Sequence, residues 1–70
     1  MKLIIGAGFL GSALAASLAG KEKVRVVNKT DSPLRGKRNV EFIEGDLKDL
    51  DWESVLRDID IVYAMHGKII

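Results

Sequence analysis

The sequence predicts an α/β fold, in which a parallel sheet of four strands in the order 3-2-1-4 carries one helix on each face. Four short runs have the length and composition of strands, and they occupy residues 2–5, 24–27, 40–44 and 61–64. Apolar residues recur at helical spacing between the first two runs and between the last two. The first 27 residues therefore form a βαβ unit, whose right-handed crossover places its strands parallel and adjacent.

The first helix is expected to begin after a glycine-rich turn that follows the strand at 2–5. Leu10, Leu14 and Leu18 recur at i, i+4 and i+8, which predicts one narrow apolar stripe on this helix. Gly20 follows the last of these leucines and is a typical signal for the end of a helix.

The middle of the chain predicts a loop and then a strand at the edge of the sheet. Residues 28–39 are polar and contain the turn signal Asp31-Ser32-Pro33. The next strand carries Glu41 and Glu44, which a central buried strand would hardly tolerate. We therefore expect the strand at 40–44 to lie at an edge.

The second helix has a start signal at Asp51, whose side chain can cap its first turn. Leu50 and Val55 can pack against each other across that cap as a hydrophobic staple. The predicted apolar face consists of Trp52, Val55, Leu56 and Ile59, at i, i+3, i+4 and i+7.

Length and composition indicate one small domain. Seventy residues without cysteine have neither disulfides nor thiolate metal sites to support a small core. We also expect one helix per face to leave a four-stranded parallel sheet incompletely covered. This predicts either a homo-oligomer or a missing C-terminal remainder of the same protein, so that residues 1–70 would be the N-terminal fragment of a longer fold.

Charge and hydropathy narrow the expected partners. Residues 1–39 carry eight Lys or Arg against two acids, whereas residues 40–70 carry three against eight. The basic residues fall mostly in connecting segments without interleaved aromatics, which argues against nucleic-acid binding. The apolar run at the start is too short for a signal peptide or a membrane span, so we expect a cytoplasmic protein without membrane contact.

The glycines at the end of the first strand have the spacing G-x-G-x-x-G. Gly6 would allow a tight turn out of the strand, Gly8 would let a pyrophosphate approach the backbone, and Gly11 would let the helix pack closely. A strand before the motif and a helix after it are the context that favours a dinucleotide site, with phosphate at the helix N-terminus. The alternative is a glycine turn without a ligand.

The end of the second strand bears on the choice of dinucleotide. A site that prefers NAD usually has an acid there for the ribose hydroxyls, and this chain has Asn28. An amide does not repel a 2′-phosphate, and Lys29 and Arg35 follow as candidates to bind one. These residues favour NADP, with NAD as the other possibility, although a solvated basic loop explains the same lysine and arginine.

Three segments, 5–12, 40–47 and 60–67, resemble successive landmarks of the extended and atypical short-chain dehydrogenases/reductases, the group that includes NAD-dependent epimerases and dehydratases. The resemblance spans almost the whole chain, and the three-glycine form is more similar to the atypical, NADP-leaning branch. It implies a Rossmann, doubly wound fold of which this chain holds the first half. It also implies that Asp46 contacts the adenine, that Leu47 packs near the ring, and that residues 64–67 line the cofactor.

The candidate cofactor-binding residues combine the glycine turn, the basic loop and these landmarks. They are Gly6, Gly8, Phe9, Leu10, Gly11, Asn28, Lys29, Arg35, Asp46, Leu47, Ala64, Met65, His66 and Gly67.

No catalytic or metal-binding residue is expected. Catalysis in the family that the chain resembles uses a tyrosine followed four positions later by a lysine, but Gly67 follows Tyr63 at that distance. We interpret Tyr63 as a packing residue of the fourth strand. His66 is the only histidine and has no second ligand nearby in the sequence.

Three functions from different classes remain open at this point. The favoured one is the cofactor-binding portion of a reductase, epimerase or dehydratase that is inactive alone. The second is a regulatory nucleotide-binding module similar to the domains that gate potassium transport, which commonly have an acid where Asn28 stands. The third is a self-associating structural fragment without a ligand.

Overall fold

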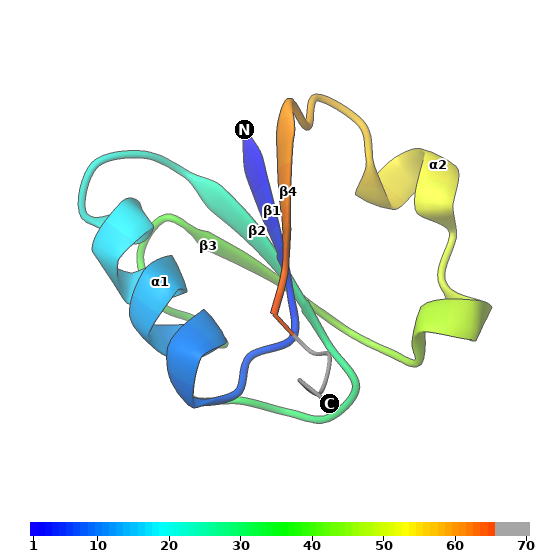
Figure 1. The fold of residues 1–70 in the computed structure, drawn as a ribbon, viewed down its shortest axis with the longest axis horizontal. Coiled ribbons are helices and arrows are strands. Elements are labelled where there is room, and N and C mark those ends of the chain that lie inside the picture. The colour runs from blue at the N-terminus through cyan, green and yellow to red at the C-terminus, as the bar shows by residue number, and fades with distance from the viewer. Residues whose placement is uncertain (66–70) are drawn as a thin grey trace.

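The computed structural model describes residues 1–65 and contains a four-stranded parallel sheet in the order β3-β2-β1-β4 (Figure 1). The predicted fold class and strand order are confirmed. The elements in chain order are β1 (Lys2–Ile5), α1 (Phe9–Ala19), β2 (Val24–Asn28), β3 (Val40–Glu44), the 3-10 turn η1 (Leu47–Asp49), α2 (Trp52–Val55) and β4 (Ile61–Ala64).

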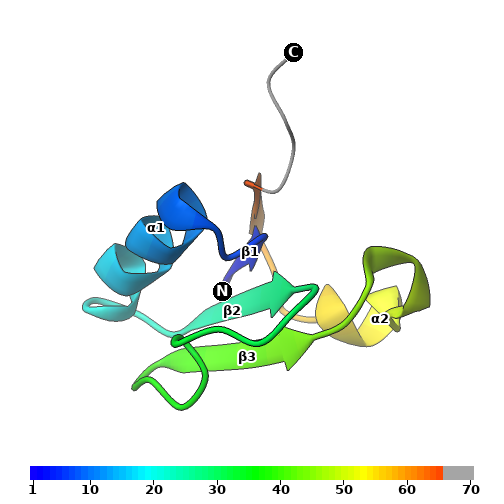
Figure 2. The same ribbon diagram turned by 90° about the horizontal axis from the view of Figure 1, so that it is seen from below.

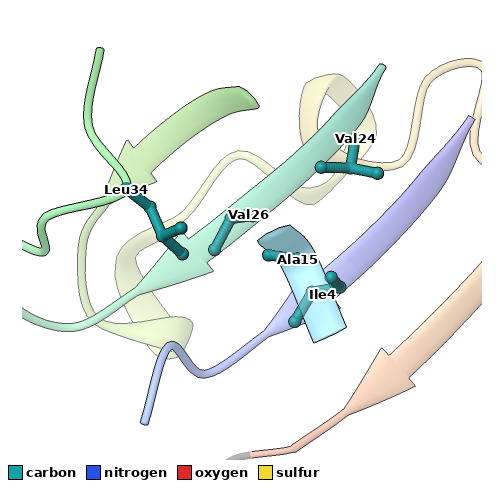
Figure 3. Close-up of a cluster of buried hydrophobic side chains, with 5 residues drawn as sticks. All are labelled: Ile4, Ala15, Val24, Val26 and Leu34. Atoms are coloured by element: carbon teal, nitrogen blue, oxygen red, sulfur yellow. The ribbon is translucent and has the colours of Figure 1, made fainter. Parts of the chain in front are cut away.

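Successive side chains of the central strands point to opposite faces of the sheet, so the core divides into two clusters. The α1-side cluster consists of Ile4, Ala15, Val24, Val26 and Leu34 (Figure 3). The α2-side cluster consists of Leu3, Ile5, Val27 and Val55. The helices lie on opposite sides of the sheet, as predicted (Figure 1). Each fully buried aliphatic side chain contributes roughly 1.5–3 kcal/mol of transfer free energy, so β1 and β2 supply most of the core.

The predicted leucine stripe of α1 is wrong at its first position. Leu10 is 65% exposed, and the buried residues of α1 are Gly11 and Ala15. Leu14 and Leu18 pack only at the margin of the α1-side cluster. Small residues face the sheet because they let the helix approach more closely than a leucine stripe would.

The second helix is a single turn, and one buried arginine supports its end. Asp51 occupies the N-cap position, but its side chain makes no capping hydrogen bond, contrary to the prediction. Leu56 is 45% exposed rather than part of the buried face. Arg25 of β2 is only 8% exposed and donates from Nη1 to the backbone oxygens of Val55 at 2.6 Å and Arg57 at 2.9 Å.

The segment between β2 and β3 is a loop, as expected. Leu34 inserts into the α1-side cluster and is 4% exposed (Figure 3). Asn39 donates from Nδ2 to the backbone oxygen of Ala19 at 2.9 Å, which ties this loop to the end of α1. The loop therefore covers part of the sheet face beside α1.

β3 and β4 are the two outer strands of the sheet (Figure 2). Their exposed side chains differ in character. β3 is an edge strand, as its glutamates predicted, and Glu41 and Glu44 are exposed. On β4, Ile61 and Val62 are 44% and 47% exposed, whereas Tyr63 packs against the α1-side cluster. Within residues 1–65, no helix has the length and apolar character needed to cross a membrane.

Candidate functional site

An open pocket of about 300 Å³ lies at the carboxyl ends of β1 and β2. Ligands of open parallel sheets bind at this end, outside the strands. The lining residues come from the ends of these two strands and from the segment after β3, and they are Ile5, Gly6, Val27, Asn28, Lys29, Asp46 and Leu47.

The glycine turn has the backbone shape that its spacing predicted. Gly6 has a φ of +98°, and its amide donates to the backbone oxygen of Val27 at 2.7 Å. A Cβ on Gly11 would collide with the backbone oxygen of Gly6, so close packing of the helix requires glycine there. A Cβ on Gly8 would meet nothing within 4 Å. Gly8 therefore leaves open space at the start of α1.

The first turn of α1 presents backbone amides to that space. Ser12 donates to the backbone oxygen of Gly8 at 2.8 Å and is the first residue of the helix with an i to i−4 bond. The amides of Phe9, Leu10 and Gly11 precede it and lack such an acceptor. Together with the helix dipole, they form an arrangement suited to a phosphate. Phe9 is 90% exposed, so its side chain is not packed over these amides.

Asn28 and Lys29 stand at the rim of the pocket. The Asn28 side chain accepts from the amide of Ala7 at 2.9 Å and donates to the backbone oxygen of Thr30 at 2.9 Å. Lys29 is exposed and takes part in none of the ion pairs found among residues 1–65. Its ammonium group is thus available to an anion in the pocket.

Arg35 is engaged elsewhere. Its guanidinium is 2.7 Å from both Asp31 and Glu44, and it lies 4.9 Å from the ring centroid of Phe42. The hydrogen bond from Arg35, together with that from the Ser32 amide, holds the pKa of Asp31 below its usual value. The structure does not place Arg35 in the pocket lining, so of the two basic candidates only Lys29 lies there.

Asp46 and Leu47 also line the pocket. Asp46 caps η1 and accepts from the amide of Lys48 at 3.2 Å. Trp52 donates from Nε1 to the backbone oxygen of Leu47 at 2.8 Å. These two hydrogen bonds fix the backbone of the segment that contributes one carboxylate and one apolar side chain to the pocket lining.

The end of β4 lies beside the glycine turn. The amide of Met65 donates to the backbone oxygen of Ile5 at 2.8 Å, which extends the β1–β4 pairing beyond Ala64. The Cβ of Met65 would lie 3.5 Å from a Cβ on Gly11. Ala64 and Met65 therefore border the side of the turn opposite Asn28. His66 and Gly67 lie outside the described residues.

A sequence model of the NAD-dependent epimerase/dehydratase family matches residues 2–69. The chain belongs to this family. A search of curated proteins and a search of solved structures found no match. Membership in the epimerase/dehydratase family implies binding of NAD or NADP, and the open space at Gly8, the amides of α1 and the adjacent pocket fit such a dinucleotide.

The sequence did not identify two pocket-lining residues of this epimerase/dehydratase family member, nor the structural role of Arg25. Ile5 and Val27 line the pocket as the last apolar residues of β1 and β2, a position that the strand ends could have indicated. Arg25 interrupts the apolar run of β2, which was the available sign of a buried, bonded cation. Among residues 1–65, no group of three or more His, Cys, Asp or Glu side chains could hold a metal ion.

Proposed function

We propose that this chain binds NADP(H), in preference to NAD(H), as the cofactor-binding portion of a reductase, epimerase or dehydratase. The observation that carries the proposal is the glycine turn, which opens α1 beside the pocket and leaves the space at Gly8 free. In this arrangement the pyrophosphate accepts from the amides of Phe9, Leu10 and Gly11. The domain would span residues 1–70 and would not be catalytic alone.

The remaining parts of the cofactor follow from the surroundings of the turn. The adenosine would occupy the pocket that Asn28, Lys29, Asp46 and Leu47 help to line. The nicotinamide half would extend past Ala64 and Met65. The shape of the pocket supports the first placement, and the position of β4 beside the turn supports the second.

The preference for NADP rests on Lys29 and on the lack of a carboxylate at the end of β2. Lys29 lines the pocket and is unengaged in the ion pairs of residues 1–65, so it can bind a 2′-phosphate. Arg35 could bind the 2′-phosphate only if it broke its ion pairs with Asp31 and Glu44. We therefore assign Arg35 a smaller role than Lys29.

Calorimetric titration of the 70-residue chain with NADPH, NADH, ATP and ADP tests the proposal. We expect NADPH to bind more tightly than NADH, and both more tightly than ATP. Equal or tighter NADH binding would remove the NADP preference. Mono- and dinucleotides binding alike would favour a regulatory nucleotide-binding module, and binding of none of the four would favour a structural fragment.

A matched pair of substitutions at exposed positions sharpens the test. Gly8→Val places a branched side chain in the space assigned to the pyrophosphate, whereas Ala13→Val adds similar bulk to an exposed position of the same helix. Binding should be lost in the first variant and kept in the second. Loss in both variants would point to an effect on the helix rather than on the site.

A further inference from the structure

Asn28 joins two loops that meet at the pocket. Its Oδ1 accepts from the amide of Ala7, in the glycine turn, and its Nδ2 donates to the backbone oxygen of Thr30, in the loop after β2. Both distances are 2.9 Å. The residues are 21 positions apart in the first contact, so this bond is a tertiary link rather than a local turn.

The partners determine the orientation of this amide group. The Ala7 amide is only a donor and the Thr30 oxygen only an acceptor, so exchanging Oδ1 and Nδ2 would break both bonds. A carboxylate at position 28 would keep the first bond and lose the second. A leucine would lose both. Asparagine is thus the side chain that satisfies both loops.

Ala7 is the residue through which this link acts on the turn. It lies between Gly6, which has a φ of +98°, and Gly8, which is the N-cap of α1. Its amide is held by Asn28, and its backbone oxygen accepts from Oγ of Ser12 at 2.8 Å. Both backbone polar groups of Ala7 are therefore fixed by side chains from outside the turn.

We propose that Asn28 is a positioning residue that holds the glycine turn in the shape that binds pyrophosphate. This inference rests on the proposed function, and it assigns Asn28 a role beyond the ribose subsite. Binding of a pyrophosphate group to the turn then depends on Oδ1 of Asn28, whether or not the ribose carries a 2′-phosphate. Inorganic pyrophosphate, which has neither a ribose nor a nicotinamide, is the ligand that isolates this role.

The test compares Asn28→Ala and Asn28→Asp in the full chain, with far-UV circular dichroism as a check of folding. Asn28→Ala removes the acceptor for Ala7 and should weaken pyrophosphate, ADP, NADH and NADPH by a similar factor of about ten. Asn28→Asp keeps an acceptor and should retain ADP binding to within about threefold. If Asn28→Ala weakens the nucleotides but leaves pyrophosphate binding unchanged, Asn28 acts on the ribose subsite and the proposal is overturned.

Hydrogen exchange of the Ala7 amide, followed by NMR, supplies a readout that needs no ligand. We expect this amide to exchange about tenfold faster in Asn28→Ala than in the original chain and to stay protected in Asn28→Asp. Equal exchange in the original chain and in Asn28→Ala would refute the link. If the original chain binds no nucleotide, the proposed function fails, and the exchange rates alone then decide whether Asn28 fixes the turn.

Discussion

Gly11 and Gly6 lie so close together that a single added carbon on Gly11 would collide with the backbone oxygen of Gly6. Gly8, between them in the sequence, would accept the same carbon without a contact. One motif therefore contains a glycine required for packing and a glycine whose surroundings are empty.

We expect Gly11→Ala to lower the free energy of unfolding by about 1–3 kcal/mol, because the helix must shift away from the turn. Gly8→Ala should change it by less than about 1 kcal/mol, since the residue has a negative φ and open space. Urea denaturation of the two variants measures the difference. Equal losses would contradict the assignment of separate tasks to the two glycines.

Arg25→Met should lower the free energy of unfolding by roughly 1–3 kcal/mol, because it leaves buried backbone oxygens at the end of α2 without a donor. It also removes the ion pair with Glu41, whose oxygen is 3.0 Å from Nε. Arg38→Met, at an exposed position, is the matched control and should leave stability nearly unchanged. Thermal unfolding compares the two, and equal effects would show that Arg25 adds nothing beyond its apolar stem.

The ion pair between Asp31 and Arg35 predicts that the free energy of unfolding depends on pH in the acid range. The pKa of Asp31 is lower in the folded chain than its ordinary value of 3.8, chiefly because of the hydrogen bond from Arg35. Its contribution to stability is therefore present above that value and is lost as the pH falls through the folded pKa. Asp31→Asn should flatten the fall in stability below about pH 4.

A carboxyl-carbon NMR titration of Asp31 checks the direction directly, with Arg35→Gln as the comparison. We expect the midpoint for Asp31 to rise in Arg35→Gln, since the first cause of the lowered pKa has been removed. A midpoint that stays in place would show that the pair does not persist in solution.

Lys29→Ala should weaken NADPH binding about tenfold and leave NADH binding nearly unchanged, because only NADPH carries the 2′-phosphate. Lys37→Ala removes a charge from the same loop away from this pocket and is the control. Isothermal titration at one fixed salt concentration measures both. An equal loss in the two variants would indicate a general effect of charge.

We expect the 70-residue chain to self-associate when produced alone, since β4 exposes Ile61 and Val62 and one short helix covers the α2 face. Sedimentation velocity over a range of concentrations should show an increasing average mass. Ile61→Lys with Val62→Thr should lower that tendency. A compact monomer at all concentrations would contradict the expectation.

The sequence predicted the strands well because their signals are local. β1, β3 and β4 have the predicted bounds, and β2 extends one residue further to Asn28. The turn at Gly6 and the close packing at Gly11 also followed from the motif itself. These features depend on neighbouring residues and on the period of the strand.

Features that depend on distant partners were not predicted. The buried state of Arg25 requires backbone oxygens 30 and 32 positions away. Arg35 resembled a free cation, because its contacts with Glu44 and Phe42 form only after β3 has joined the sheet. Leu10 is exposed because α1 turns its small residues, and not its leucines, toward the sheet. Which face turns inward depends on how closely α1 approaches β1.

The bond between Asn28 and Ala7 also has a thermodynamic consequence. It links the order of the loop that begins at Thr30 to the order of the glycine turn, and such a linkage is reciprocal. A ligand that stiffens the turn therefore stabilises the loop against opening, and opening of the loop weakens the ligand by the same coupling free energy. The affinity of this site is then adjustable from the loop, at positions that never touch the ligand.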